Sequence, residues 1–279
     1  MQLRFFLISI LIVLSVCCPV SVEAQKCKVI SFNIRGDLKH DGHNRWKYRR
    51  VGMAKFFESV NPDILCLQEA KENQINDLKR HFHKLNIVCD SCKKGNVHFF
   101  FNREKFAIIN QGYFGLSEKP DSIGYIGWDA KYPRMAIWAN LKCLKTGRIV
   151  FVINTHLDNV GRLARLNSIK QIMDTIPILS QTENVILTGD FNSSEKSSVY
   201  KFVTRHQLKD TYHHSPSVEG VNYTFHGFGK REVEKRKKID HIFVSQLLDV
   251  KNVLIPQEKP KDGVYLSDHN PVITTITLN

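Results

Sequence analysis

The segment Gly189-Asp190-Phe191-Asn192 places a carboxylate and a carboxamide two residues apart at the end of an apolar run. The preceding Val185-Ile186-Leu187 is typical of a buried strand, and alternate residues of an extended chain point to the same side. Asp190 and Asn192 are therefore expected to face one ligand. For this segment alone, an Asx turn that caps a short helix is an equally good interpretation, so the rest of the chain has to decide.

Polar side chains that can bind ligands recur at the ends of other apolar runs. Strand ends that share one edge of a sheet are where α/β enzymes build their sites. A random scatter would place such residues on helix faces as well. We therefore expect one site assembled from six segments, whose polar residues are Asn33, Glu69, His156, Asp190 with Asn192, Asp240 with His241, and Asp268 with His269.

The residue types in this set suit a hard divalent metal ion and proton transfer near neutral pH. Carboxylate and carboxamide oxygens are ligands for magnesium, calcium or manganese rather than zinc. His156 lies near Asp158 in the sequence, and His269 follows Asp268; a carboxylate beside a histidine raises its pKa and fixes its tautomer. This combination is typical of metal-assisted phosphoester hydrolysis. The sequence has no Gly-rich phosphate loop and no GxSxG motif.

The elements that must position these residues are many strands and fewer helices. Apolar residues recur every three or four positions at 48–60 and 163–176, which predicts two helices, the first of them ended by Pro62. Because several strands follow one another directly, we expect mixed rather than all-parallel sheets in an α/β fold. The strand-like runs are Cys27–Ile34, Ile64–Gln68, Val97–Phe101, Arg134–Leu141, Ile149–Thr155, Val185–Gly189, Ile239–Val244, Val250–Ile255 and Val272–Leu278.

Six short motifs, in this order, resemble the endonuclease/exonuclease/phosphatase superfamily, which includes pancreatic deoxyribonuclease, the AP endonucleases and the neutral sphingomyelinases. Together they are highly specific and cover nearly all of the chain from Lys28 to Leu278, although GDFN or SDH alone would be weak. The motifs are SFNIR with Asn33, LQE with Glu69, NTHLD with His156, GDFN with Asp190 and Asn192, IDH with Asp240, and SDHNP with Asp268 and His269.

The resemblance implies the fold and the metal site. The fold would be a four-layer α/β sandwich, in which two mixed β-sheets pack face to face and helices flank them outside. Glu69, with Asn33 beside it and Asp268 nearby, would hold the metal ion. The expected ion is Mg2+, with Mn2+ or Ca2+ as alternatives.

The resemblance also implies catalytic roles. Asp190 would orient or deprotonate the attacking water, and Asn192 would contact the phosphate. Asp240 would pair with His269, whose imidazolium would contact a phosphoryl oxygen. His156 would be the second catalytic histidine.

The segment Gly127–Arg134, with the sequence GWDAKYPR, resembles secreted, often uncharacterised members of the superfamily. Arg134 falls where deoxyribonuclease-like members carry a phosphate-contacting arginine, although a lone arginine more often forms a structural ion pair. Trp128 is expected either to stack on substrate or to wedge into the core. AP endonucleases have an acidic residue where this chain has Arg35, which argues against abasic-site repair. Many relatives have a tyrosine where this chain has Phe99-Phe100-Phe101.

Residues 1–24 have the pattern of a secretory signal peptide. Arg4 lies in a short positive start, an apolar run extends from Phe5 to Val16, and Val22-Glu23-Ala24 is a small-residue cleavage pattern. The run is shorter than the roughly 20 residues that a membrane span needs, so an uncleaved anchor is the weaker alternative. We expect a secreted chain in which residues 25–279 form one domain without a transmembrane segment.

Basic residues outnumber acidic ones. Lys and Arg total 40 against 27 Asp and Glu, and the net charge of +13 attracts polyanions or anionic surfaces. The segment Lys230–Lys238 carries six bases against two acids shortly before Asp240, so we expect it at the mouth of the site. It favours a polyanionic substrate or membrane phosphate over a merely solvated loop, and a dibasic processing site is a further interpretation.

Five cysteines follow residue 24, so at least one is free or pairs outside the chain. Cys66 lies in an apolar run and is most simply a buried thiol. Cys89 and Cys92 are expected to form a local disulfide, because no second close pair completes a zinc site. A disulfide between Cys27 and Cys143 then follows by elimination only.

The sequence therefore predicts a secreted, divalent-metal-dependent phosphoric-ester hydrolase. A nuclease or phosphodiesterase is preferred because of the basic charge and the deoxyribonuclease-like SFNIR, so nucleic acid or another phosphoester is the expected partner, and no protein partner is inferred. A phospholipid hydrolase of sphingomyelinase type or an inositol-phosphate hydrolase is the first alternative. A catalytically silent binding protein is the second, although it would not need the intact catalytic set. A glycan is expected at Asn222 rather than at Asn192, where it would block the site.

Overall fold

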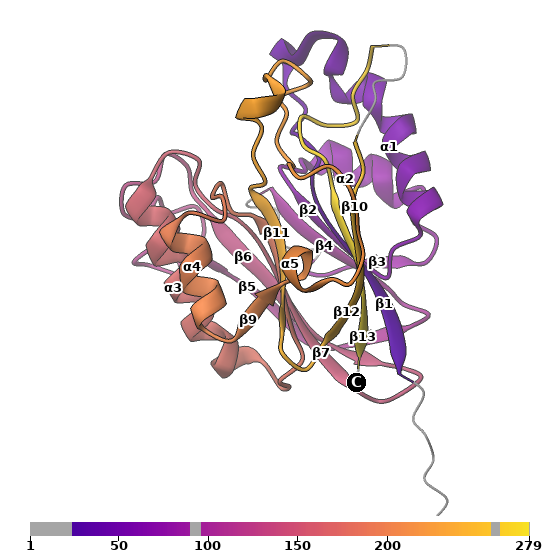
Figure 1. Ribbon diagram of the computed structural model, residues 1–279, viewed down its shortest axis with the longest axis vertical. Coiled ribbons are helices and arrows are strands. Elements are labelled where there is room, and N and C mark those ends of the chain that lie inside the picture. Colours follow the sequence, from indigo (N-terminus) through magenta and orange to yellow (C-terminus); the bar gives the residue numbers. More distant parts are fainter. Residues whose placement is uncertain (1–23, 90–95, 258–262, 279) are drawn as a thin grey trace, which may run out of the picture.

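The computed structural model describes residues 24–89, 96–257 and 263–278. It consists of two mixed β-sheets packed face to face between two layers of helices (Figure 1). The four-layer α/β sandwich expected from the sequence is confirmed. Residues 1–23 of the predicted signal peptide, and Cys92 of the predicted local disulfide, lie outside the described residues.

Seven strands form the first sheet: β1 (Gln25–Asn33), β2 (Ile64–Gln68), β3 (Leu85–Ile87), β4 (Val97–Asn102), β10 (Val218–Gly220), β12 (Asp249–Ile255) and β13 (Val272–Leu278). Their order is β10-β12-β13-β1-β2-β4-β3. β1 pairs in parallel with β2 and antiparallel with β13. Because both faces of the sheet are covered, its central strands are continuous apolar runs, and β2 is buried at every residue.

Six strands form the second sheet: β5 (Phe106–Gly115), β6 (Met135–Cys143), β7 (Ile149–His156), β8 (Val185–Asp190), β9 (Leu208–Asp210) and β11 (Asp240–Ser245). Their order is β5-β6-β7-β8-β11-β9. β7 and β8 are parallel, and β11 is antiparallel to β8. The start of β11 therefore lies beside the end of β8.

The helices cover the outer faces of the two sheets. α1 (Trp46–Val60) and α2 (Glu72–Lys79) lie on the first sheet, and α3 (Arg162–Leu179) and α4 (Ser198–Arg205) lie on the second (Figure 1). The short helices are α5 (Thr211–His214), η1 (Lys39–Asn44) and η2 (Val233–Lys235). α1 ends at Asn61, whose φ of 49° is the left-handed conformation of a helix C-cap, directly before Pro62. Within the described ranges, no helix is long and apolar enough to cross a membrane.

Apolar side chains fill three interfaces, one between the sheets and one under each helical layer. Phe32, Phe57 and Phe100 are fully buried where α1 covers the first sheet. Ile169 and Ile172 of α3 are buried against the second sheet. These contacts hold the helices in place because each helix buries one apolar face.

All of the predicted strands and both predicted helices are present, with ends shifted by three residues or fewer. The four edge strands, β3, β5, β9 and β10, were not predicted; in β5 all residues except the first and the last are exposed or half-buried, and its middle contains Asn110-Gln111-Gly112. Leu163 belongs to the predicted apolar face of α3 but is 52% exposed, since it lies in the first turn of the helix. Edge strands and helix ends are the places where burial and sequence pattern diverge.

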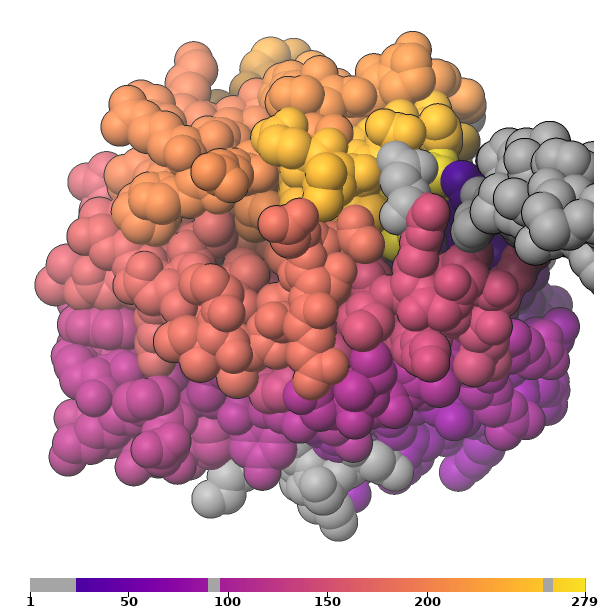
Figure 2. All heavy atoms as spheres, turned by 90° about the horizontal axis from the view of Figure 1, so that it is seen from below, coloured from indigo at the N-terminus to yellow at the C-terminus, as the bar shows by residue number. Residues whose placement is uncertain are grey.

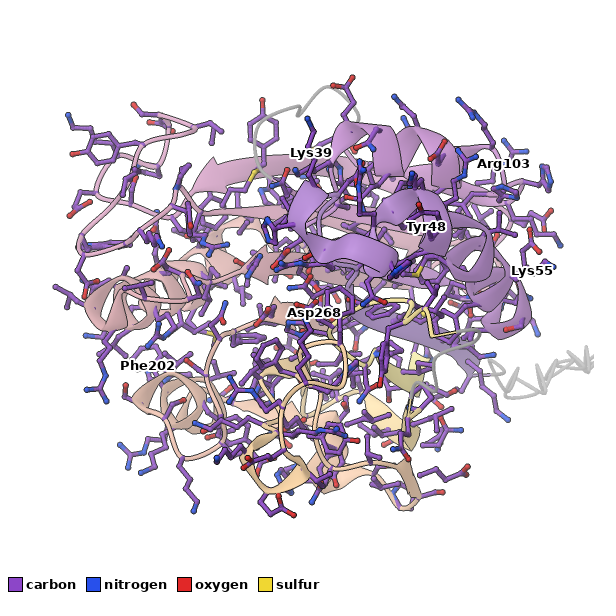
Figure 3. The ribbon with its side chains drawn as sticks, turned by 90° about the horizontal axis from the view of Figure 1, so that it is seen from above. Lys39, Tyr48, Lys55, Arg103, Phe202 and Asp268 are labelled. Carbon is purple, nitrogen blue, oxygen red and sulfur yellow. The ribbon has the colours of Figure 1, made fainter. Side chains whose placement is uncertain are left out.

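The carboxyl ends of β1, β2, β7 and β8 meet at one edge of the sandwich, at the top of Figure 1. In the view onto this edge, Asp268 lies near the centre of the molecule (Figure 3). Seen from the opposite end, the first half of the chain occupies one side and the C-terminal part the other, with the middle of the chain between them (Figure 2). The edge in Figure 3 therefore joins segments from across the sequence.

The expected disulfide between Cys27 and Cys143 is wrong, because both are free, buried thiols in the structure. Cys27 on β1 and Cys143 on β6 belong to opposite sheets, and both contribute to the apolar interface between them. Cys66 is a buried thiol, as expected, and burial raises its pKa to about 12. These thiols therefore serve as small apolar side chains in the core.

Candidate active site

The register of three strands brings the predicted catalytic residues to adjacent positions. Asp190 at the end of β8 lies opposite His156 on β7 and opposite Asp240 on β11. The close approach of β7 to β8 requires a glycine before Asp190. Gly189 has a φ of 152°, and a Cβ there would overlap the carbonyl oxygen of Thr155. The glycine that ends the apolar run is thus explained by strand packing.

His269 and Asp240 form a buried pair at the centre of this edge. His269 Nδ1 lies 2.8 Å from Asp240 Oδ2, and its Nε2 lies 3.8 Å from Asp190 Oδ2. The Thr224 hydroxyl accepts a hydrogen bond from the Asp240 N–H at 3.1 Å, and the Phe225 ring packs against the imidazole at 4.9 Å. The Nδ1 contact fixes the ring so that Nε2 points toward Asp190.

Electrostatics determine the protonation of this group. Burial disfavours the charged form of His269, but the Asp240 carboxylate outweighs burial and, with Asp190, raises the pKa of His269 to about 10. Burial and then Asp240 raise the pKa of Asp190 to about 7. At neutral pH, His269 is therefore an imidazolium donor, and Asp190 titrates in the range where a general base is effective.

Asn33 connects the catalytic group to the predicted metal side. Its Nδ2 donates to Glu69 Oε1 at 3.2 Å and to Asp190 Oδ2 at 3.0 Å. Its Oδ1 accepts from the backbone N–H of Arg35 at 3.0 Å. Asn33 therefore orients two carboxylates in this arrangement, and its place in a metal site stays a prediction.

Glu69 and Asp268 have the chemistry that a hard divalent ion requires. The Glu69 side chain is 27% exposed, so one side of it is open to solvent. Burial raises the pKa of Asp268, and Glu69 adds to the increase against the opposing effect of His269. Two carboxylates that repel each other in a largely buried place favour a positive charge beside them, part of which the Arg35 guanidinium already supplies. The ligand atoms of Asp190, Asp240 and His269 also lie within 4.8 Å of one another, but there the imidazolium already balances the charge.

Arg35 also contacts both of these carboxylates. Its Nη1 lies 3.9 Å from Glu69 Oε2 and 3.6 Å from Asp268 Oδ2. Asp41 holds the same guanidinium through hydrogen bonds of 3.0 and 3.1 Å. In the sequence, Arg35 stands out only as a departure from the AP endonucleases. Its position two residues after Asn33 was a signal that it reaches the same site.

His156 and Asn192 form the other side of the site. Asn192 Nδ2 lies 3.1 Å from His156 Nε2 and also donates to the Leu157 carbonyl at 3.0 Å. His156 Nε2 lies 3.4 Å from Asp190 Oδ2. Burial, and then the positive charge of Arg134, lower the pKa of His156 well below its usual value. His156 is therefore a neutral imidazole at neutral pH, unlike His269.

Arg134 lies close to this histidine but is held by an acidic residue. Its Nε lies 3.4 Å from Asp158 Oδ2, and Asp158 also accepts from the backbone N–H groups of Tyr132, Val160 and Gly161. The structural ion pair that sequence reasoning kept as an alternative is thus present. The predicted contact of Arg134 with substrate stays a prediction.

The basic segment Lys230–Lys238 lies beside the site, and one of its basic residues, Lys238, is not exposed as expected. The Arg231 guanidinium lies over the Phe225 ring at 4.9 Å, and Phe225 packs on His269. Lys238, in contrast, is buried and belongs to a charge cluster rather than to an open basic surface. Its burial follows from its position two residues before β11.

The charge cluster around Lys238 connects the start of β11 with the turn that follows β8. Lys238 Nζ lies 2.7 Å from Asp210 Oδ2 and 2.9 Å from Glu195 Oε1. His241 Nε2 lies 3.0 Å from the Ser193 carbonyl oxygen. Glu195, Asp210 and His213 have the ligand spacing of a metal site, but the ammonium of Lys238 already lies among the acids. The cluster ties the start of β11 to the turn after β8.

The sequence profile described as Endonuclease/Exonuclease/phosphatase family matches residues 30–269. The chain belongs to this family of phosphoester hydrolases. The match spans the whole site, from the strand that ends in Asn33 to His269, which is predicted to be catalytic. An enzyme that cleaves phosphoesters is therefore the class that the fold and the site define.

Known proteins similar to this chain include nucleases and a phosphatase. A DNA-(apurinic or apyrimidinic site) endonuclease of Dictyostelium discoideum is 24% identical over 92% of this chain and 73% of its own length. Nocturnin of Xenopus laevis is 25% identical over 65% of this chain, which spans about half (51%) of that protein.

Solved bacterial structures match over nearly the whole chain. A family member from Bacteroides vulgatus has a TM-score of 0.86 and 35% identity, covering 91% of this chain and 100% of that one. The mannosyl-6-phosphatase Bt3783 of Bacteroides thetaiotaomicron has a TM-score of 0.82 and 30% identity, covering 90% and 100%.

Proposed function

We propose that this protein is a divalent-metal-dependent hydrolase of phosphodiesters, with nucleic acid as its substrate class. The observation that carries the proposal is the continuous chain of contacts from Asp240 to Glu69. Asp240 holds His269 at 2.8 Å, His269 faces Asp190, and Asn33 joins Asp190 to Glu69. This chain of contacts supports a site in which an imidazolium, a carboxylate base and a carboxylate that could hold a metal ion act on the same phosphate.

The protein groups divide the chemistry among themselves. The His269 imidazolium donates to a phosphoryl oxygen, and the Asn192 amide contacts the phosphate from the side of His156. Asp190, whose pKa is about 7, orients the attacking water and accepts its proton. Donors and base are held by buried hydrogen bonds, so little reorganisation is needed during the reaction.

Glu69 and Asp268 would hold the metal ion, with Mg2+ as the expected ion and Mn2+ or Ca2+ as alternatives. A cation bound there supplies charge neutralisation of the phosphoryl oxygens. Arg35 remains beside it through its two hydrogen bonds to Asp41. The carboxylate oxygens and the raised pKa of Asp268 support this placement.

The test is hydrolysis of bis(p-nitrophenyl) phosphate, DNA and RNA by the purified protein, with Mg2+ or with excess chelator. Glu69→Gln should reduce the rate by at least about 100-fold, because metal-site partners typically contribute that much. Glu104→Gln is the matched control, since its side chain is 57% exposed in an ion pair with Lys84. Full activity in excess chelator would contradict the metal mechanism.

Two features support nucleic acid as the substrate. The chain carries a net charge of +13, and its basic segment packs next to His269 through Phe225. Cations near the site attract the phosphate backbone and increase the rate of encounter. The endonuclease name of the Dictyostelium relative agrees with this choice.

A sugar phosphate is the second candidate, and sequence identity favours it. The bacterial mannosyl-6-phosphatase is 30% identical over 90% of this chain, against 24% for the Dictyostelium endonuclease. The two candidates are separated by measuring kcat/KM on mannose 6-phosphate and on a dinucleotide with the same preparation. A higher kcat/KM for mannose 6-phosphate than for the dinucleotide would show that the protein is a phosphatase rather than a nuclease.

We also propose that the chain is secreted after cleavage near Ala24. Cleavage there would leave β1 complete, since this strand begins at Gln25. Asn222 is exposed, as a glycan would require. The intact mass of protein from culture medium, before and after enzymatic deglycosylation, tests both proposals.

A further inference from the structure

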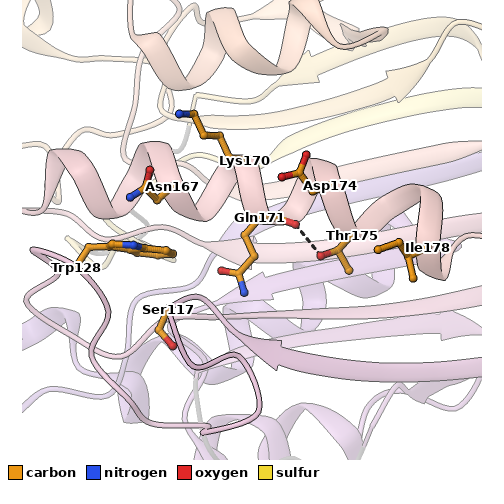
Figure 4. Close-up of a pocket in the computed structure, with 8 residues that line it drawn as sticks. All are labelled: Ser117, Trp128, Asn167, Lys170, Gln171, Asp174, Thr175 and Ile178. Atoms are coloured by element: carbon orange, nitrogen blue, oxygen red, sulfur yellow. Dashed lines mark hydrogen bonds between the residues drawn. The ribbon is translucent and has the colours of Figure 1, made fainter.

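A pocket of about 410 Å³ lies on the outer face of α3, beside the segment that contains Trp128 (Figure 4). Its volume is within the range of about 300–1,000 Å³ that is usual for small-molecule sites. Trp128 lies on one side and Ser117 below it, while Asn167, Gln171 and Asp174 project from α3. None of these residues has a role in the phosphoester site.

The backbone of the segment Gly127-Trp128-Asp129 is fixed next to α3. A Cβ at Gly127 would lie 2.5 Å from the Ser117 Cα, so only glycine permits this close packing. The backbone N–H of Trp128 donates to the Glu118 carboxylate at 3.0 Å. The Asp129 carboxylate accepts from the Ala164 N–H at 2.6 Å, at the N-terminus of α3. Each residue of the motif therefore helps to present the ring.

Trp128 itself has a strained backbone, with a φ of 49°. A bulky residue adopts this conformation only where its surroundings impose it, and such strain is common at ligand sites. The ring is half-buried rather than packed into the core. It therefore presents a fixed aromatic surface to the pocket.

Gln171 adds a second, independent sign of a ligand. Its Nε2 donates to the Gly115 carbonyl at 3.1 Å, which fixes the orientation of the amide. Its Oε1 is buried and has no hydrogen-bond partner among the residues that the structure describes. In Figure 4 this amide points from α3 toward Ser117, beside Trp128. A buried acceptor without a donor is unfavourable, and a ligand hydroxyl would satisfy it once the Gln171 amide shifts slightly toward the pocket.

We propose that this pocket binds the ring of a pyranose sugar. One face of a pyranose consists largely of C–H groups, which pack on an aromatic ring. Hydroxyls around its rim both donate and accept, so they can serve the Gln171 acceptor, the Asp174 carboxylate and the Asn167 amide together. Lys170 and Asp174 balance each other in charge, which disfavours a phosphate or another anion here.

Binding is measured by saturation-transfer-difference NMR on the full mature chain with methyl pyranosides of glucose, mannose, galactose and N-acetylglucosamine. A single sugar ring should bind with a Kd on the order of 1 mM, as its size permits. The saturation should concentrate on protons of one ring face. This measurement does not depend on phosphoester hydrolysis, so the pocket and the proposed function fail or succeed separately.

Variants assign the binding to the pocket. Trp128→Ala should weaken it at least about tenfold, whereas Trp128→Phe should retain most of it, because a smaller aromatic surface remains. Gln171→Met should weaken binding while preserving side-chain volume. Tyr48→Ala is the control, since Tyr48 is 52% exposed on α1, which covers the other sheet.

Three results would overturn the proposal. They are the absence of saturable binding for every pyranoside in the panel, equal binding by Trp128→Ala protein of native thermal stability, and stronger binding of free nucleosides than of pyranosides. The last result would assign the pocket to a nucleobase.

Discussion

Replacing Asp240 with Asn should switch His269 from a charged to a neutral side chain without changing the shape of the site. The pKa of His269 lies near 10, against about 6.5 for an unperturbed histidine. At about 1.4 kcal/mol per pH unit, the surroundings favour the imidazolium by about 5 kcal/mol. Without the Asp240 carboxylate at 2.8 Å, only Asp190 and Asp268 oppose the effect of burial, so the pKa of His269 is expected to fall well below 10.

The expected loss of kcat/KM at pH 7 is about 100- to 10,000-fold, the range for a positioned proton donor. The direction in which activity changes with pH follows from the pKa of His269. The parent keeps its imidazolium up to pH near 10, whereas the variant is expected to lose its imidazolium, and with it activity, at a lower pH than the parent. NMR titration of His269 and pH–rate profiles on bis(p-nitrophenyl) phosphate measure both effects.

A double-mutant cycle provides the decisive comparison. If the pair works as one unit, Asp240→Asn with His269→Ala should be scarcely slower than either single variant. Asp249→Asn is the control, because that side chain is 55% exposed. Strictly additive losses, or an unchanged His269 titration in the folded Asp240→Asn protein, would refute the reasoning.

Three further predictions test the supports of the site. Asp210→Asn should lower the free energy of unfolding by about 3–5 kcal/mol at pH 7, because it leaves Lys238 buried without this partner. Surrounding groups depress the pKa of Asp210 in the folded protein, so the stability that its carboxylate contributes is fully present above pH about 4 and is lost as the pH falls toward the depressed folded pKa. In urea unfolding, the free energies of the parent and the variant should therefore converge in acid. A difference that stays constant with pH would contradict this. Replacing the exposed Lys230, Lys235 and Lys237 with Gln should reduce the slope of log affinity for duplex DNA against log salt concentration by up to about 3. The control, Lys47→Gln with Lys55→Gln on α1, should leave the slope unchanged. Equal slopes for both variants would show that the basic segment does not bind the substrate. Gly189→Ala should cost roughly 3 kcal/mol in thermal unfolding, against about 1 for Gly124→Ala, whose Cβ would meet no neighbour; equal costs would mean that close packing at Thr155 is unimportant.

Much of the fold was predictable because its determinants are local. Runs such as Ile64–Gln68 and Val272–Leu278 are strands whose predicted and observed ends agree. An apolar run followed by Gly189 and Asp190 marks a strand end wherever it occurs, since side-chain alternation and glycine geometry depend only on neighbouring residues. β5 escaped prediction because an edge strand is covered on fewer sides and carries polar residues.

The membership of the site also followed from the sequence, because each of its polar residues lies at the end of a strand. The pairing of Asp240 with His269 was expected from the family resemblance, and the structure shows it at 2.8 Å. The position of Arg35 between Glu69 and Asp268 was not predicted, because it depends on how the segments meet in space. The sequence contains each side chain, but not the distance between them.

Tertiary structure alone decided the environment of the charged and sulfur-containing side chains. Lys238 ends a basic run, yet it is buried between Asp210 and Glu195 because the chain enters β11 two residues later. Cys27 and Cys143 remain thiols in the core between the sheets, contrary to the pairing reached by elimination. Trp128 lies in a pocket on α3 rather than in the core or at the phosphoester site. Periodicity and strand ends are encoded by neighbours in the chain, whereas burial, pKa and pairing depend on residues that the fold brings together from far apart in the sequence.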